Sequence, residues 1–130
     1  MISINKKIPD TNVIIRYLLK DHEEHFKIAH EFFESVKSGN TKIIINECVI
    51  AECVYVLLKI YNVPKDNIVS NLKILLSYKG VKNIDREELI EALTLFNIYN
   101  IDIVDCILCA KAKKLGMELF TFDKELMKRC

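Results

Sequence analysis

The sequence contains few of the residues that interrupt a polypeptide chain. Its three glycines stand singly at positions 39, 80 and 116, and it has only two prolines. No segment rich in proline, glycine or serine divides it, and it contains neither a low-complexity tract nor an internal repeat. The chain has 130 residues, 51% of them hydrophobic, which is enough to bury one core without disulfide or metal support. We therefore expect a single domain over residues 1–130.

Long apolar runs are also absent. No uninterrupted hydrophobic stretch approaches the roughly 20 residues that a helix needs to cross a bilayer. The first residues, MISINKK, are polar and lack the apolar core of a signal peptide. The sequence therefore predicts a soluble, cytoplasmic protein that makes no membrane contact.

A large charge of one sign is missing as well. The 19 basic and 18 acidic residues leave a formal charge of +1, which is no strong signature of nucleic-acid binding. If a metal ion neutralised four of the acids, the remaining surface would carry about +5. Such a surface favours a polyanionic partner.

Cysteine and histidine occur in patterns that argue against zinc or redox chemistry. The five cysteines form an odd set, and most lie in apolar helical runs, where cysteine acts as a small hydrophobic residue. Cys106 and Cys109 have helical spacing, and no second pair at zinc-site spacing accompanies them. His22, His25 and His30 lie on or just before a charged helix, so we expect them to be exposed. These patterns favour a reducing compartment and a core role for most of the cysteines.

Strand-like and helical segments alternate along the chain. Short apolar runs predict strands at residues 3–8, 42–46, 81–84 and 118–122, and hydrophobic residues spaced by three and four predict helices between them. Helices that separate strands imply a parallel sheet covered on both faces, so the expected fold class is α/β. Three sites are predicted to cap helices, namely Asp21 with Glu24, Asp85 with Glu88, and Asp102 before the helix at 103–115. Asp10 and Asp123 stand where strands are expected to give way to helices, and each could also act as a cap.

Glu52 is the only ionisable residue in the run CVIAECVYVLL at positions 48–58. It falls inside the hydrophobic stripe of this helix instead of on its polar back, and an acid facing a core is costly unless it is compensated. Asp105 is likewise alone in IVDCILCA, while Asp10 and Asp123 directly follow or split apolar stretches. In open parallel sheets ligands gather beyond the carboxyl ends of the strands, where all four acids can converge.

A shared divalent cation would explain four acids in apolar settings. Two carboxylates about 4 Å apart repel by roughly 4 kcal/mol at an effective dielectric constant near 20. Oxygen ligands without well-placed histidine or cysteine favour Mg²⁺ or Mn²⁺ over Zn²⁺. Each acid taken singly also has an ordinary explanation, as a helix cap, a first-turn acid or half of a buried ion pair.

Four short segments in this order give the chain a resemblance to a known family. They are DTNVIIRYLL near the start, the glutamate within VIAECVYVL, IDIVDCILCAKAKKLG, and TFDKEL at the end. Together they resemble the PIN-domain nucleases, particularly the VapC-type ribonuclease toxins, over nearly the whole chain. The family usually has a clean apolar strand up to its first acid, whereas KKIP precedes Asp10 here. The resemblance implies a three-layer α/β/α sandwich with a central parallel sheet.

The resemblance also implies an activity, namely metal-dependent endoribonuclease cleavage that leaves 5′-phosphate and 3′-hydroxyl ends. Asp10, Glu52, Asp105 and Asp123 look like the family's four acids, which hold one or two Mg²⁺ or Mn²⁺ ions. Implied partners are an antitoxin protein, whose tail blocks the acidic cleft, and a second copy of the chain. The polar residues expected to support the acids are Asn12 and Thr121, with Asp102 as either a helix cap or a fifth acid.

RNA is expected to lie along basic residues near the acidic mouth, although each of these residues alone fits an ordinary solvated helix face. The candidates for phosphate contacts are Arg16, Lys20, Lys111, Lys113, Lys114 and Lys124.

Two other functions compete with this interpretation. A Mg²⁺-dependent phosphotransfer protein also places aspartates at strand ends, but a haloacid-type phosphatase needs an aspartate where this chain has Asn12. Receiver domains need an acidic pair early in the chain and a phosphoacceptor aspartate after a central strand, where this chain has the helical Glu52. A PIN-like module that binds without cutting is the second alternative, and the presence of all four acids argues against it.

Overall fold

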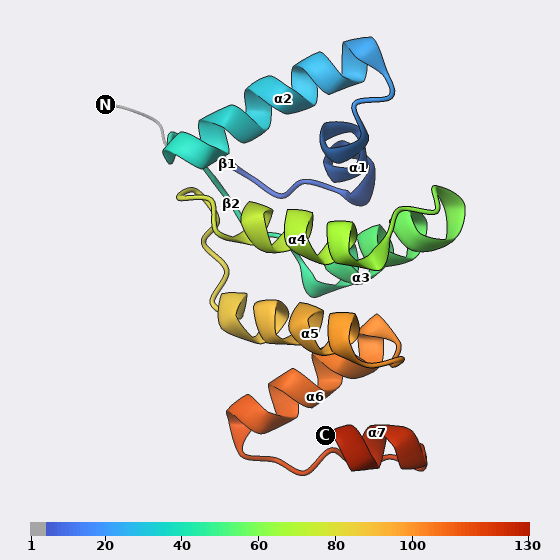
Figure 1. Cartoon of the computed structure of the whole chain (residues 1–130). Helices are drawn as coiled ribbons and strands as arrows, with labels where there is room; N and C mark the ends of the chain where they lie inside the picture. Colours follow the sequence, from blue (N-terminus) through green and yellow to red (C-terminus); the bar gives the residue numbers. More distant parts are fainter. Residues whose placement is uncertain (1–4) are drawn as a thin grey trace. The chain divides into compact units, whose positions relative to one another are not determined.

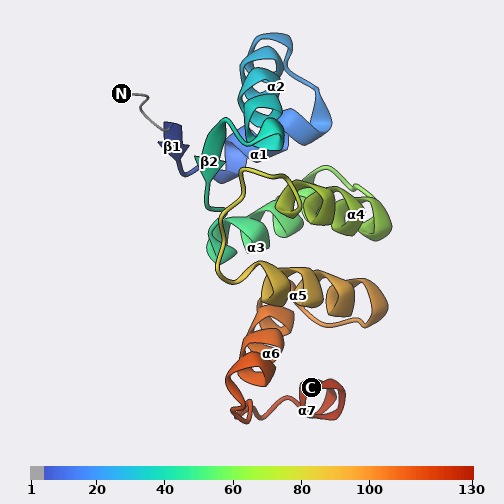
Figure 2. The same cartoon turned by 90° about the vertical axis from the view of Figure 1, so that its left-hand side faces the viewer.

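The computed structural model describes residues 5–130, which fall into two compact units, one ending at Ile84 and the other spanning Asp85–Cys130 (Figures 1 and 2). The elements of the first unit are β1 (Asn5–Lys7), α1 (Thr11–Leu19), α2 (Glu23–Ser38), β2 (Thr41–Ile43), α3 (Glu47–Tyr55), the π-helical turn η1 (Val56–Ile60) and α4 (Lys65–Leu76). The second unit holds α5 (Arg86–Ile98), α6 (Ile103–Leu115) and α7 (Lys124–Arg129).

The sheet of the first unit is small and parallel. Strand β1 pairs with β2 so that Asn5 lies opposite Thr41 and Lys7 opposite Ile43. A parallel bridge between Ile43 and Val81 adds the segment after α4. The predicted parallel pairing is thus confirmed, and the strand expected at 42–46 begins one residue earlier and ends sooner. Positions 3 and 4 of the first expected strand lie outside the described residues.

An asparagine side chain replaces strand pairing where β2 ends. The backbone N–H of the buried Ile45 donates to Oδ1 of Asn83 at 2.8 Å, and Nδ2 of Asn83 donates to the Ile45 carbonyl oxygen at 2.7 Å. These bonds satisfy both polar groups of the Ile45 backbone, which would be costly to bury unpaired. The segment 81–84 therefore contributes a bridge and an amide side chain instead of a longer strand.

Gly80 permits the close approach of α2 to this sheet. Its N–H donates to the Val36 carbonyl oxygen at 2.8 Å. A Cβ atom at this position would lie 2.6 Å from the same oxygen and would also collide with the Thr41 carbonyl oxygen. A glycine is therefore required for β2 and the end of α2 to meet.

Most of the predicted helix ends are found. The Asp10 side chain caps α1, the Asp102 and Asp123 side chains cap α6 and α7, and Gly39 ends α2 with a left-handed φ of 89°. The predicted cap at Asp21 is wrong, because His22 caps α2 and the Asp21 carboxylate instead binds Arg16 Nη1 at 2.9 Å.

In the second unit, α5 packs against α6 through the buried residues Leu89, Leu93, Phe96 and Cys106. Asp85 stands at the start of α5 as predicted, but its side chain makes no capping bond and accepts instead from Lys111 Nζ at 3.0 Å. A lysine at this distance gives the carboxylate a charge-assisted hydrogen bond, which is stronger than a neutral cap.

Two sequence predictions for the second unit are wrong. Residues 118–122 form no strand and remain irregular between α6 and α7. Cys109 on α6 is buried as predicted, but the expectation of reduced cysteines fails, because Cys109 forms a disulfide with Cys130, with a Cα–Cα separation of 5.7 Å. Cys53 and Cys106 are buried free thiols, as predicted. None of the helices in residues 5–130 is long and apolar enough to span a bilayer.

Candidate metal and catalytic site

Asp10 lies where the chain leaves β1 and enters α1. Its Oδ1 accepts a hydrogen bond from the Val13 N–H at 3.1 Å, which satisfies one of the free donors of the first helical turn. The carboxylate is exposed and keeps its other oxygen available. Capping therefore holds Asp10 at the helix N-terminus, where the helix dipole favours a negative charge.

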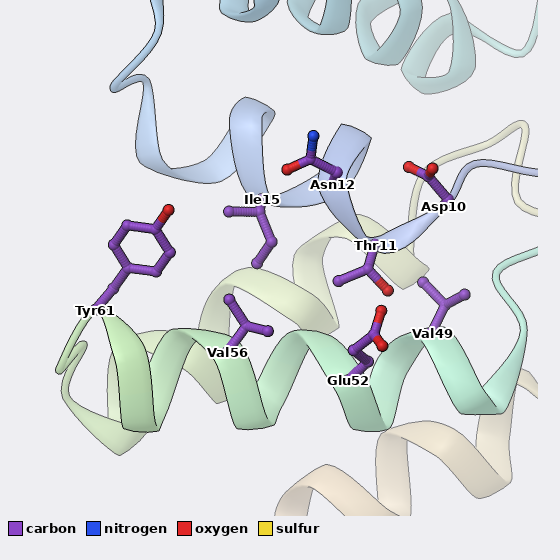
Figure 3. Close-up of a pocket in the computed structure, with 8 residues that line it drawn as sticks. All are labelled: Asp10, Thr11, Asn12, Ile15, Val49, Glu52, Val56 and Tyr61. Atoms are coloured by element: carbon purple, nitrogen blue, oxygen red, sulfur yellow. The ribbon is translucent and has the colours of Figure 1, made fainter.

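Glu52 lies in the middle of α3, which packs against α1. Asn46 caps this helix by accepting a hydrogen bond from the Cys48 N–H at 2.8 Å. The N-cap of the helix therefore lies six residues before Glu52. The core-facing side of α3 is formed by Ile50, Cys53 and Val54. The expectation that Glu52 faces the core is wrong, because its side chain is exposed and points across to α1 (Figure 3).

Asp10 and Glu52 line one pocket of about 410 Å³ between α1 and the α3–η1 segment (Figure 3). The Glu52 carboxylate points toward Thr11, while Asp10 and Asn12 stand on the α1 side (Figure 3). The pocket is completed by Ile15, Val49, Val56 and Tyr61. Two acids on a largely apolar wall form a setting in which a cation is held with little competition from other polar groups.

The pKa of the buried Cys53 thiol on α3 depends on the charges of both Glu52 and Asp10. Burial raises the pKa of the Cys53 thiol to about 12, and the negative charges of Glu52 and Asp10 add to this shift. A third negative charge, the thiolate, is therefore disfavoured beside the pocket. Cys53 remains a neutral core thiol at neutral pH.

The other acids singled out from the sequence lie in the second unit. Partial burial raises the pKa of Asp105 above its usual value, and the negative charges of Asp102 and Asp123 raise it further. Each neighbour also caps a helix: Asp102 accepts from the Val104 N–H at 3.2 Å and Asp123 from the Leu126 N–H at 3.0 Å. Mutual repulsion at Asp105 is the condition that a bound cation relieves.

Thr121 supports Asp123 directly. Its Oγ1 accepts a hydrogen bond from the Asp123 N–H at 3.1 Å. The hydroxyl thus fixes the backbone that carries the carboxylate, which is the kind of indirect support that orients ligands. Asn12 lines the pocket of Asp10 and Glu52.

The donor set of the first unit fits Mg²⁺ or Mn²⁺. Within residues 5–130 no group of three or more His, Cys, Asp or Glu side chains is arranged to hold a metal ion by itself. Mg²⁺ does not need such a cage, because proteins commonly bind it through one or two carboxylates and leave the remaining positions to water and substrate phosphate. Asp10 and Glu52 supply two such carboxylates in one pocket.

Comparison with known proteins supplies the family. The model of the PIN domain family matches residues 7–130 of the chain. The chain belongs to the PIN domain family. It is also 29% identical over 124 residues to the VapC ribonuclease of Aquifex aeolicus (strain VF5), an alignment that covers 94% of this chain and 90% of that protein. No solved structure matches the chain.

The resemblance to the PIN family and its VapC-type members is thus confirmed, and with it the α/β PIN-like fold class. The family match runs across both compact units. The assignment of residues 1–130 to a single domain stays a prediction.

Most of the basic residues predicted to contact RNA already have acidic partners in this PIN domain. The ion pairs are Arg16 with Asp21 at 2.9 Å, Lys111 with Asp85 at 3.0 Å, Lys113 with Glu91 at 3.7 Å and Lys114 with Glu87 at 3.8 Å. Lys20 lies 5.8 Å from the centre of the Phe26 ring, and Lys124 is exposed at the start of α7. Partial neutralisation makes the paired residues weaker anchors for phosphate than their charge alone suggests.

Sequence reasoning missed two residues of the acid pocket, Thr11 and Tyr61. Thr11 stands between Asp10 and Asn12, so its position in the segment DTN was the available signal. Tyr61 follows the π-helical turn η1, and no sequence pattern announces that turn. A change of helix type alters which side chains face the pocket.

Proposed function

We propose that this PIN domain is a metal-dependent endoribonuclease that hydrolyses RNA phosphodiester bonds and serves as the toxin of a toxin–antitoxin pair. Family membership and the similarity to a VapC ribonuclease support a nuclease. The observation that carries the proposal for this chain is that Asp10 and Glu52, distant in sequence, line the same pocket.

In this proposal Asp10 and Glu52 hold Mg²⁺ or Mn²⁺ together with Asp105 and Asp123 from the second unit. A divalent ion held by these acids would supply Lewis-acid stabilisation of the charge on a phosphodiester group. Asp10 is held at the entrance of α1 by its capping bond, and Thr121 fixes the backbone of Asp123. Thr11 offers a neutral polar group beside the Glu52 carboxylate, and Asn12 lines the same pocket.

The proposed partners follow from the same assignment. They are an RNA substrate, an antitoxin protein that covers the acid pocket, and a second copy of the chain in a homodimer. We propose a cytoplasmic location, where RNA is the substrate at hand. Disulfides are uncommon in that compartment, so Cys109 and Cys130 are expected to be reduced there and to form their bond under oxidising conditions.

RNA cleavage tests the proposal. Purified wild-type protein is expected to cut RNA with Mg²⁺ or Mn²⁺ and to stop when EDTA is added, whereas Glu52→Gln removes the charge but keeps the shape and should lower the rate by at least about 100-fold. Glu31→Gln changes the same charge at an exposed position of α2 and should cut as wild type.

Each alternative function has its own outcome. RNA binding without cleavage at any metal concentration would point to a binding module. Labelling by acetyl phosphate would point to phosphotransfer. Cleavage that persists in EDTA would contradict the metal-dependent mechanism.

A further inference from the structure

Four lysines come together at the small parallel sheet, and we refer to Lys6, Lys7, Lys42 and Lys82 as the lysine edge. The register of the sheet places Lys6 opposite Lys42, and β1 and β2 lie side by side (Figure 2). Lys82 follows the bridge at Val81, and its N–H donates to the Ile43 carbonyl oxygen at 2.8 Å. All four lysines line one open hollow of about 580 Å³.

Within residues 5–130 no acid forms an ion pair with a lysine of the lysine edge. The ion pairs of residues 5–130 involve other basic residues, and no acid among the described residues lines this hollow. Like charges directly opposite each other on neighbouring strands destabilise a sheet. Retaining Lys6 opposite Lys42 thus lowers stability, and an anionic ligand would offset that effect.

The apolar lining of the hollow suits a nucleic acid strand better than a small anion. Ile8 and Ile44 line it with 72% and 48% of their surface exposed. Proteins that bind single strands combine a groove of positive charge for the backbone with apolar or aromatic surface beneath sugars and bases. Lysines and exposed isoleucines that line one hollow reproduce this combination.

The hollow is linked to the acid pocket through shared lining residues of a third hollow. Lys7 and Ile8 line a neighbouring hollow of about 560 Å³ that reaches Asp10 and Asn12. Asp10 and Asn12 in turn line the pocket that contains Glu52. A strand that follows these surfaces within the first unit passes from the lysine edge to the carboxylates.

We propose that the lysine edge binds the phosphate backbone of the single-stranded RNA whose scissile bond lies at Asp10 and Glu52. This inference rests on the proposed function, since it takes RNA as the ligand. It assigns the principal phosphate contacts to lysines of the sheet, in place of the paired basic residues of α1 and α6.

Salt-dependent RNA binding tests the inference without cleavage. The protein carries Glu52→Gln, and fluorescence anisotropy measures its affinity for a labelled single-stranded RNA over a range of salt concentrations. The test variant, Lys6→Gln/Lys42→Gln/Lys82→Gln, removes three of the proposed phosphate contacts. It should weaken binding by about 10- to 100-fold near 0.1 M salt and make the slope of log K against log salt about 2 units shallower.

Two control variants isolate the position and the charge. Three exposed lysines of the first unit outside the hollow, changed together, should alter affinity much less; they are Lys27→Gln, Lys59→Gln and Lys79→Gln. An arginine version of the test variant keeps the charge and should keep the affinity and the slope. Circular dichroism reports whether each variant is folded.

Equal losses in the test and control variants, or no loss in either, would overturn the inference. The proposed function fails separately, when the protein with Glu52 intact does not cut RNA. RNA binding that depends on the lysine edge but is never followed by cleavage would support this inference and contradict the proposed nuclease activity.

Discussion

At the scale of single residues, Asp10 has two tasks that a substitution can separate. Its Oδ1 caps α1 through the Val13 N–H, and the residue lines the pocket that also contains Glu52. The position of Asp10 before an apolar helical run allowed this cap. It did not predict that Glu52 is exposed, because hydrophobic spacing alone does not reveal how α1 leaves an opening above α3.

We predict that Asp10→Asn abolishes RNA cleavage while leaving stability nearly unchanged, because asparagine caps a helix about as well as aspartate but carries no charge. Asp10→Ala should abolish cleavage and also lower the free energy of unfolding by about 1 kcal/mol. Urea unfolding and a cleavage assay on the same samples check both effects. Cleavage at the wild-type rate by the asparagine variant would remove Asp10 from the site.

At the scale of elements, helix ends were predictable and strands were not. Asp102 caps its helix as predicted, and Asp123 does so as its position allowed, since a cap depends on local backbone donors. Asp21 does not, because the nearby Arg16 guanidinium competes for its carboxylate. A strand depends on a distant partner, so residues 118–122 have strand-like composition and form none.

The contact between α1 and the segment after α4 gives a pH-dependent prediction. Tyr17 on α1 shares a hydrogen bond of 2.7 Å with the Tyr78 hydroxyl, and burial followed by this bond raises the Tyr17 pKa above its usual range. A raised pKa on folding stabilises the protein fully below the unfolded value, about 10, and this stability is lost as the pH rises above it.

The free energy of unfolding should therefore fall between pH 9 and pH 11 in the wild type and fall less in Tyr17→Phe. At pH 8 the phenylalanine variant should be less stable by about 1 kcal/mol, the usual net value of one hydrogen bond. Chemical unfolding at both ends of this pH range measures the difference. Identical pH profiles for the two proteins would show that this contact does not couple to pH.

The disulfide of the second unit gives another prediction for an element, the helix α7. The bond between Cys109 and Cys130 closes a loop of sequence separation 21, which restricts the unfolded chain. Cys130→Ser should lower stability by up to about 3 kcal/mol, and reductant should lower the wild type to the same level. Cys48→Ser, at an exposed free cysteine, is the control and should melt as the wild type does. Thiol titration of the wild type, denatured without reductant, checks the bond itself. Five reactive thiols would show that the disulfide is absent.

At the scale of the whole molecule, the sequence predicted the family and the α/β class correctly, because the four acidic segments keep their order over nearly the whole chain. It could not predict the Cys109–Cys130 bond, since the spacing of cysteines does not fix their pairing. It also could not predict which lysines lack acidic partners, because Lys6 and Lys42 meet only through the register of the sheet.

The central proposal of this account is that Glu52 and Asp105 are each ligands of a divalent ion. Calorimetric titration of Mn²⁺ into the wild type, Glu52→Gln and Asp105→Asn tests it most directly. We expect a site in the wild type and a loss of affinity of at least about 10-fold in each variant, because each removes one charged ligand. Mn²⁺ binding to Asp105→Asn with wild-type affinity would contradict the claim.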